Sequence, residues 1–217
     1  YECYVERFGD DEIANEDITK VDKKIIPNAT LLVGGFPCQD YSVARSKKNE
    51  KGIEGKKGVL FWEIIRATEN IKPKYLILEN VDRLLKAPSK QRGRDFAIML
   101  TAFNNLGYSV EWRVINAADY GRSQRRRRVF FFVYRNDTEF ARLIDNQFEH
   151  NDFIFEEHKY DEYLFRTGLF ATQFPIKNIP VKNRHVFHEL GENIVEVSDN
   201  FTGTVWNTGI MRYGKYY

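Results

Sequence analysis

The first residues that could carry out chemistry surround a cysteine in a tight turn. The segment Gly35-Phe36-Pro37-Cys38-Gln39 follows the apolar run 29–34, which predicts a buried strand that ends at the turn. Pro37 would stiffen the approach to Cys38, and Gln39 can both donate and accept hydrogen bonds. Cys38 could therefore face a cleft as a nucleophile, and nearby positive charge would favour its thiolate. The structural alternative is a small buried cysteine, which is common for a free thiol.

A carboxylate follows the next apolar segment. Residues 74–81 read Lys-Tyr-Leu-Ile-Leu-Glu-Asn-Val and predict a second buried strand, with its polar residues at the carboxyl end. Glu79, at the mouth of that strand, could donate a proton to a ring nitrogen. The alternative is an exposed carboxylate at a strand end that caps the following turn.

Five arginines fall within residues 122–128 and lead into an apolar strand. Strand alternation would place Arg126 and Arg128 on one side and Arg125 and Arg127 on the other. One side could face a cleft and bind phosphates or a base carbonyl. The alternative is a solvated basic edge strand that resists aggregation.

The elements that must position these residues form a regular alternation. Helical spacing of apolar residues predicts a helix from about residue 60 to just before Pro73 and another over about 96–103, closed by Gly107. Further strands are predicted at 108–114 and 129–134. Strands that alternate with helices predict an α/β fold with a doubly wound, mostly parallel sheet that is covered on both faces. Ligands of such sheets bind beyond the carboxyl ends of the strands, so we expect Cys38 and Glu79 to meet there.

The chain divides into two parts in this interpretation. Residues 1–137 carry the regular alternation of strands and helices. From residue 138 to 217 the periodicity fades, and the stretch 149–162 is acidic and aromatic. The sequence therefore predicts a catalytic domain over 1–137, followed over 138–217 by a linker and the start of a smaller region.

Composition limits the class of protein. With 42% hydrophobic residues the chain can bury a core, and a net charge of only +2 confines nucleic-acid binding to a local patch. Cys3 and Cys38 cannot build a disulfide framework or a zinc site, and the four histidines have no metal spacing, so no metal is expected. No apolar run approaches the length of a membrane span. We expect a cytoplasmic, nucleoid-associated protein.

The three motifs together resemble the DNA cytosine-5 methyltransferase family of bacteria and phages. Pro37-Cys38-Gln39, Glu79-Asn80-Val81 and the Gln-x-Arg-x-Arg run of residues 124–128 occur in the order and with the spacing of that family. The resemblance covers residues 8–136. Residues 206–211 and Gly214 resemble the opening of a target-recognition domain. The resemblance implies a Rossmann-like fold of the type that S-adenosylmethionine-dependent methyltransferases share.

The resemblance also implies a mechanism. Cys38 would add to carbon 6 of a cytosine flipped out of duplex DNA, and carbon 5 would then accept a methyl group from S-adenosylmethionine. Glu79 would stabilise ring N3, Arg128 would contact the base O2, and Arg126 would hold the cysteine loop or a phosphate. Two further sets of residues follow from the family. The donor would be bound by Asp17, Ile18, Pro37 and Leu60. DNA would be contacted by Gln39, Ser42, Gln124 and Arg126, together with a basic loop over residues 45–57.

Some family features are not found in the sequence. The glycine-rich donor loop, Phe-x-Gly-x-Gly, and the acidic residue that would bind the donor ribose are absent, so we expect the chain to be part of a longer enzyme. Two alternatives stay open: a tRNA cytosine-5 methyltransferase with the same motifs, and a catalytically inactive DNA-binding relative. The expected partner is duplex DNA, with a cognate restriction endonuclease as a further one, and the expected state is a monomer.

Overall fold

The structure is a computed structural model. It describes residues 1–11, 13–36, 59–148, 157–177 and 187–217. Within them, seven strands form one sheet in the order β1-β2-β4-β3-β6-β7-β5. The strands are Leu31–Gly35 (β1), Tyr75–Val81 (β2), Tyr108–Asn116 (β3), Arg127–Arg135 (β4), His188–Glu189 (β5), Thr208–Arg212 (β6) and Lys215–Tyr216 (β7).

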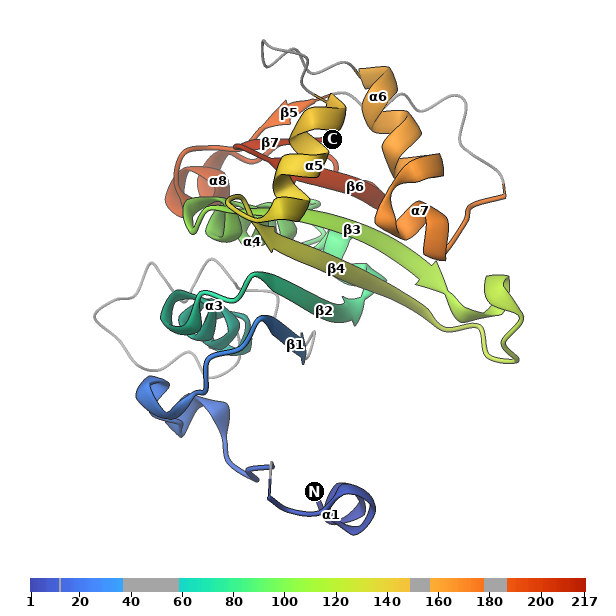
Figure 1. The fold of residues 1–217 in the computed structure, drawn as a ribbon. Helices are drawn as coiled ribbons and strands as arrows, with labels where there is room; N and C mark the ends of the chain where they lie inside the picture. Colours follow the sequence, from blue (N-terminus) through green and yellow to red (C-terminus); the bar gives the residue numbers. More distant parts are fainter. Residues whose placement is uncertain (12, 37–58, 149–156, 178–186) are drawn as a thin grey trace.

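The helices follow the same chain order, and Figure 1 shows them around the sheet. The α-helices are Glu2–Phe8 (α1), Val59–Ile71 (α3), Arg94–Asn105 (α4), Glu139–Phe148 (α5), Glu157–Glu162 (α6), Leu169–Gln173 (α7) and Ile194–Asn200 (α8). The short 3₁₀ turns are Ile18–Lys20 (η1), Lys23–Ile25 (η2), Asp82–Lys86 (η3) and Ala117–Tyr120 (η4), and Tyr163–Thr167 (η5) is a π-helical turn.

The α/β class is as predicted, but the sheet is mixed rather than mostly parallel. Among the described strands, β1 and β2 are the one parallel pair of neighbours, and β4 lies antiparallel between β2 and β3. The prediction was wrong here because β3 and β4 are joined through residues 117–126, which hold only the turn η4 and cannot cross the sheet. Strands β1, β2 and β3 still run in one direction. Their carboxyl ends therefore share an edge, which we call the catalytic edge, and β4 begins at that edge.

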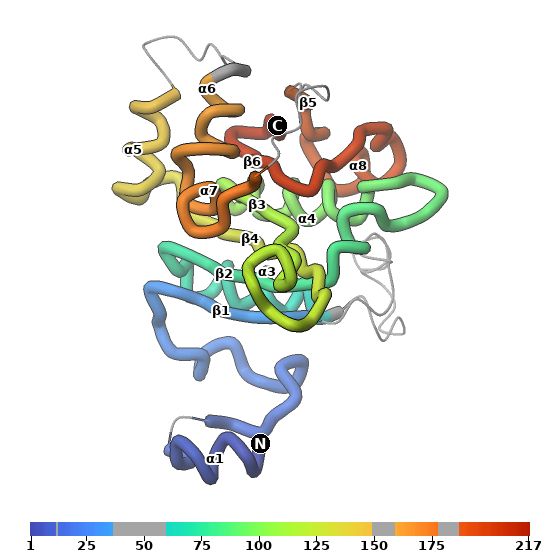
Figure 2. The backbone as a smooth tube through the Cα atoms, turned by 90° about the vertical axis from the view of Figure 1, so that its right-hand side faces the viewer, coloured from blue at the N-terminus to red at the C-terminus, as the bar shows by residue number. Residues whose placement is uncertain are grey.

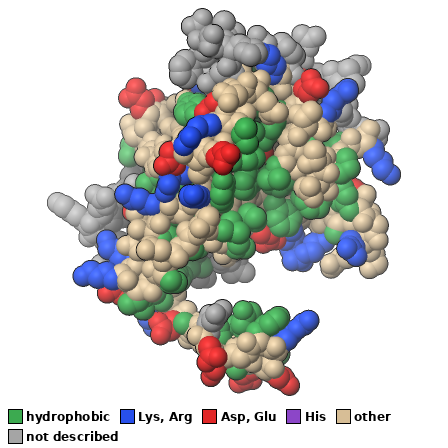
Figure 3. Space-filling view, in the orientation of Figure 1, with side chains coloured by type: hydrophobic (Ala, Val, Ile, Leu, Met, Phe, Trp, Pro, Cys, Tyr) green, Lys and Arg blue, Asp and Glu red, His purple; other side chains and the backbone are tan. Residues whose placement is uncertain are grey.

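A large apolar core fills one face of the sheet. It joins α3, α4 and α8 to β2, β3 and β4, and Phe96 at its centre packs edge-on against Trp112. A second cluster lies on the opposite face, where α5, α6 and η5 cover β6 through side chains such as Phe148 and Tyr160. On the rest of that face, the described helices leave β1 uncovered, and Val33 is 66% exposed; Figure 3 shows apolar side chains gathered on the face seen in Figure 1. The helix layers of the two faces thus cover different parts of the sheet (Figures 1 and 2).

The region from residue 138 onward continues the same sheet. Strand β6 pairs with β3, with Gly209 opposite Trp112. A Cβ at Gly209 would collide with the Trp112 ring and with the carbonyl oxygen of Tyr217, so only glycine allows this approach. The indole Nε1 of Trp112 also donates to the Trp206 carbonyl oxygen at 2.8 Å. The two predicted regions are therefore connected through β3.

Candidate active site

The catalytic edge holds an ion pair between Glu79 and Arg128. Glu79 lies near the end of β2 and Arg128 near the start of β4, and Arg128 Nε lies 2.8 Å from Glu79 Oε1. The two residues share a face because Arg128 pairs in register with Val81, two positions beyond Glu79. Neither side chain is buried, so the pair is open to a ligand. The structure thus brings together two of the predicted catalytic residues.

The strand that leads to Cys38 runs beside Glu79. Gly35, the last residue of β1, pairs in register with Glu79, and a Cβ at Gly35 would lie 3.5 Å from Glu79 Oε2. Cys38 follows Gly35 by three residues in the sequence. Pro37, Cys38, Gln39 and Ser42 lie outside the described residues, as does the predicted basic loop 45–57.

Asn80 has a role that the sequence analysis did not assign. It is 2% exposed, its Nδ2 donates to the Phe36 carbonyl oxygen at 2.9 Å, and its Oδ1 accepts from Val81 N at 2.8 Å. Asn80 therefore holds the backbone at the last described residue before the cysteine turn. A signal existed in the sequence, since alternation with Leu76 and Leu78 puts Asn80 on the buried side, where an amide needs partners.

The other arginines of the run have different surroundings. Arg126 is exposed and precedes β4, so strand alternation does not fix its direction. Its carbonyl oxygen accepts from Ala117 N at 3.0 Å. Arg127 forms an ion pair with Asp82 of η3 rather than with Glu79, with 2.8 Å between Arg127 Nε and Asp82 Oδ2. Gln124 is exposed in the loop before β4. This part of the edge is accessible and basic.

The residues predicted to bind the donor lie on η1 and α3. Asp17 caps η1: its Oδ1 accepts from Thr19 N at 3.0 Å and from Thr19 Oγ1 at 2.8 Å. The hydrogen bonds from Thr19 lower the pKa of Asp17 below its usual value, so Asp17 is a carboxylate at neutral pH. The Ile18 carbonyl oxygen accepts from Arg66 of α3 at 2.8 Å, while its side chain is 39% exposed. Leu60 lies half-buried at the start of α3.

Among the residues that the structure describes, no three His, Cys, Asp or Glu side chains are grouped closely enough to hold a metal ion. In the same parts of the chain, no helix has the length and apolar character to cross a lipid bilayer.

The chain is similar in sequence to bacterial methyltransferases. The chain is 52% identical to the Type II methyltransferase M.Sau3AI of Staphylococcus aureus, over 99% of this chain and 50% of the relative. It is 36% identical to the Type II methyltransferase M.HhaI of Haemophilus parahaemolyticus, over 70% of this chain and 45% of the relative. Among solved structures, the S. pombe Dnmt2 methyltransferase aligns with a TM-score of 0.49 at 15% identity, over 79% of this chain and 51% of that one. The chain thus spans about half the length of the curated relatives it matches.

A family model decides the assignment. The model described as C-5 cytosine-specific DNA methylase matches residues 1–211, nearly the whole chain, and that range contains all three motifs. The chain belongs to the C-5 cytosine-specific DNA methylase family.

Proposed function

We propose that the full protein is a DNA cytosine-5 methyltransferase, which transfers a methyl group from S-adenosylmethionine to carbon 5 of a flipped cytosine in duplex DNA. The observation that carries this proposal is the Glu79–Arg128 ion pair at the catalytic edge, beside the strand that leads to Cys38, in a chain of this family. A partly exposed carboxylate and guanidinium held together can contact two neighbouring atoms of a pyrimidine ring.

Cys38 is the proposed nucleophile. Its thiolate adds to carbon 6 of the cytosine, which makes carbon 5 electron-rich. Carbon 5 would then form the new bond to the methyl group as the methyl–sulfur bond of the sulfonium breaks and S-adenosylhomocysteine leaves. Loss of the carbon 5 proton to water would then expel the thiolate and restore the ring. Glu79 hydrogen-bonds ring N3 and stabilises the charge that develops there, while Arg128 contacts the base O2. Asn80 supports this geometry because it holds the backbone at Phe36.

The residues described near η1 fit part of a donor site. When bound, S-adenosylmethionine supplies a methyl group on an electrophilic sulfonium. Oδ1 of Asp17 accepts both bonds from Thr19, so Oδ2 is available to accept from the adenine amino group. The exposed side chain of Ile18 offers an apolar surface to the adenine ring. Leu60 and Pro37 are proposed to complete this part of the site.

Duplex DNA is proposed to lie along the catalytic edge. Arg126 and Gln124 are exposed there and can contact phosphates, and Gln39 and Ser42 are proposed to do the same from the cysteine turn. In this proposal residues 1–137 form the catalytic part, and residues 138–217 form a linker and the first part of a target-recognition region.

A covalent trapping experiment tests the mechanism. The full protein is incubated with tritiated S-adenosylmethionine and duplex DNA that carries 5-fluorocytosine, which blocks loss of the group at carbon 5 and so preserves the adduct. We expect a tritium-labelled protein–DNA adduct that survives denaturation. Cys38→Ala should abolish the adduct. Cys3→Ala is the matched control, because Cys3 is an exposed cysteine on α1, and it should leave the adduct unchanged.

Other outcomes would overturn the proposal in defined ways. An adduct that persists in Cys38→Ala would exclude Cys38 as the nucleophile. An adduct with transfer RNA and none with DNA would indicate a tRNA cytosine-5 methyltransferase. DNA binding without any adduct would indicate a catalytically inactive relative.

We further propose that the protein acts as a monomer beside a cognate restriction endonuclease. Two relatives carry the name Type II methyltransferase, which supports this context. Protection of methylated DNA from an endonuclease encoded next to the gene would support the partner, and the mass in solution would test the monomer.

A further inference from the structure

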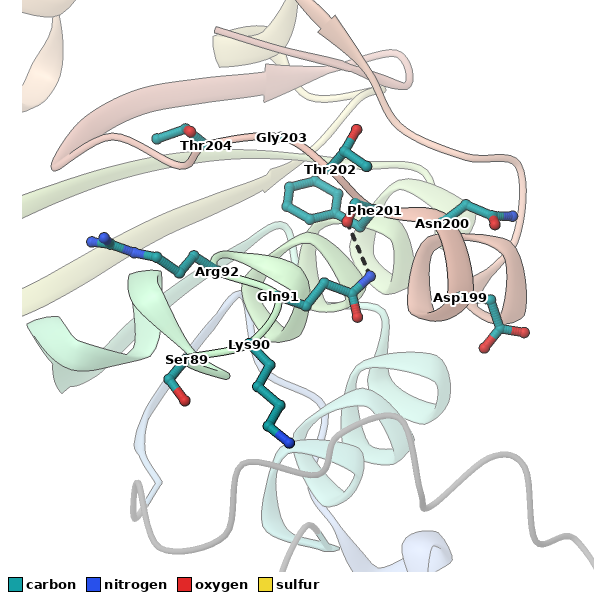
Figure 4. A pocket seen from close by; sticks show the side chains of 10 residues that line it. All are labelled: Ser89, Lys90, Gln91, Arg92, Asp199, Asn200, Phe201, Thr202, Gly203 and Thr204. Atoms are coloured by element: carbon teal, nitrogen blue, oxygen red, sulfur yellow. Dashed lines mark hydrogen bonds between the residues drawn. The ribbon is translucent and has the colours of Figure 1, made fainter.

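A groove lies at the catalytic edge, away from the motif residues. It has a volume of about 660 Å³ and is lined by residues 89–92 on one side and 199–204 on the other (Figure 4). The first wall precedes α4, which runs back from the carboxyl end of β2. The second wall leads into β6, which begins opposite the carboxyl end of β3, where Asn207 O accepts from Val114 N. Topology therefore places both walls at the edge where the base would bind.

The two walls are fixed to each other. Gln91 Nε2 donates to the Phe201 carbonyl oxygen at 3.0 Å, which Figure 4 shows as the link across the groove. Gly93, at φ +86°, is so close to the second wall that a Cβ would lie 3.1 Å from Val205 Cγ2. Gly203 is packed against the Tyr216 hydroxyl so tightly that a Cβ could not be accommodated. The groove is thus a built feature of the fold.

Two side chains and a run of backbone N–H groups along the groove have no partners within the described chain. The side chains of Lys90 and Arg92 form no ion pair there, and the N–H groups of residues 202–204 form no hydrogen bond there. In Figure 4, Arg92 extends toward the Thr204 side of the groove, whereas Lys90 extends away from the second wall, so they are suited to two separate anionic groups. The acidic residue of the lining, Asp199, lies at the α8 end of the groove.

We propose that this groove binds the backbone of one DNA strand next to the target base, with Lys90 and Arg92 each contacting a phosphate. This inference rests on the proposed function, because it requires duplex DNA at the catalytic edge. Lysines scattered over a surface would attract DNA phosphates without fixing the position of the DNA. A groove whose walls are linked by the Gln91–Phe201 hydrogen bond, with two cations and backbone N–H donors, would instead hold a phosphate chain in one register.

Salt dependence of binding to duplex DNA tests the proposal in the full protein. Each phosphate contact contributes about 0.9 to the slope of log affinity against log salt concentration. Lys90→Gln and Arg92→Gln should each lower the slope by about 1, and the double variant should lower it by about 2. KM for DNA should rise while the single-turnover rate at saturating DNA is unchanged. The matched control is Lys72→Gln with Lys74→Gln, two exposed lysines at the opposite edge of the sheet, where β2 begins.

A neutral phosphate analogue locates the contact. A set of duplexes with one methylphosphonate each should show positions that weaken binding of the wild type but not of the double variant. The double variant could show the same salt slope and the same methylphosphonate pattern as the Lys72/Lys74 control. The groove would then not bind DNA, although the proposed function would stand. If the wild type neither binds nor methylates duplex DNA, the proposed function fails and the groove proposal fails with it.

Discussion

At the scale of single residues, the neighbouring arginines Arg127 and Arg128 offer a matched comparison. Arg128 pairs with Glu79 at the site, whereas Arg127 pairs with Asp82 beside it. Arg128→Ala should lower the single-turnover rate by roughly 10²–10³-fold, as loss of one donor to a developing charge does, with little change in DNA affinity. Arg127→Ala removes an exposed ion pair of roughly 0–1 kcal/mol and should change the rate less than about fivefold. Rapid-quench rates and DNA dissociation constants measure both effects, and equal losses in the two variants would contradict the role of Arg128.

At the scale of elements, the pairing of β6 with β3 depends on Gly209. Gly209→Ala must displace either Trp112 or the Tyr217 backbone, because both lie within contact distance of the new methyl group. Overpacking of this kind costs about 1–3 kcal/mol, so the melting temperature should fall by several degrees. Gly34→Ala in β1 is the control, since its new Cβ would meet only Leu78 Cδ2 at an ordinary 3.7 Å. Calorimetry that shows the same melting temperature for both variants would refute this account.

The elements also show how far the sequence could predict the structure. Apolar spacing predicted α3, α4 and strands β1 to β4 with ends that differ by a few residues from those observed. It could not predict that β4 lies between β2 and β3, because a strand pattern does not encode the order of strands in a sheet. The contact between Arg128 and Glu79 depends on that order. Helix α5 was missed although Ala141, Ile144 and Phe148 have helical spacing and are buried.

At the scale of the whole molecule, stability should depend on pH through a buried glutamate. Burial raises the pKa of Glu111 to about 7, although a hydrogen bond from Tyr163 and the charges of Arg212 and Arg113 act in the opposite direction. The folded protein therefore holds this proton more tightly than the unfolded chain does. Its contribution to the free energy of unfolding is complete below about pH 4.5 and is lost as the pH rises through about 7, by about 3 kcal/mol in total.

The variant Glu111→Gln isolates this contribution. The free energy of unfolding is measured with denaturant for both proteins between pH 4.5 and 8.5. As the pH rises, the wild type should lose stability relative to the variant. Burial also raises the pKa of Asp95, but Asp95 is present in both proteins, so its effect cancels in the difference. A difference that stays constant across the range would mean that Glu111 does not titrate there.

The antiparallel direction of β4 has a consequence for how such a protein could change over time. A strand that ran parallel to β2 would end at the catalytic edge. The position of its last residues would then depend on the register of the whole strand that precedes them. Strand β4 instead starts there, so the loop 117–126 that precedes it can lengthen or shorten while Arg128 stays in register with Val81. Such variation would change the exposed, basic part of the edge without moving Arg128 away from Glu79. The topology thus uncouples the length of this loop from the position of the Glu79–Arg128 pair.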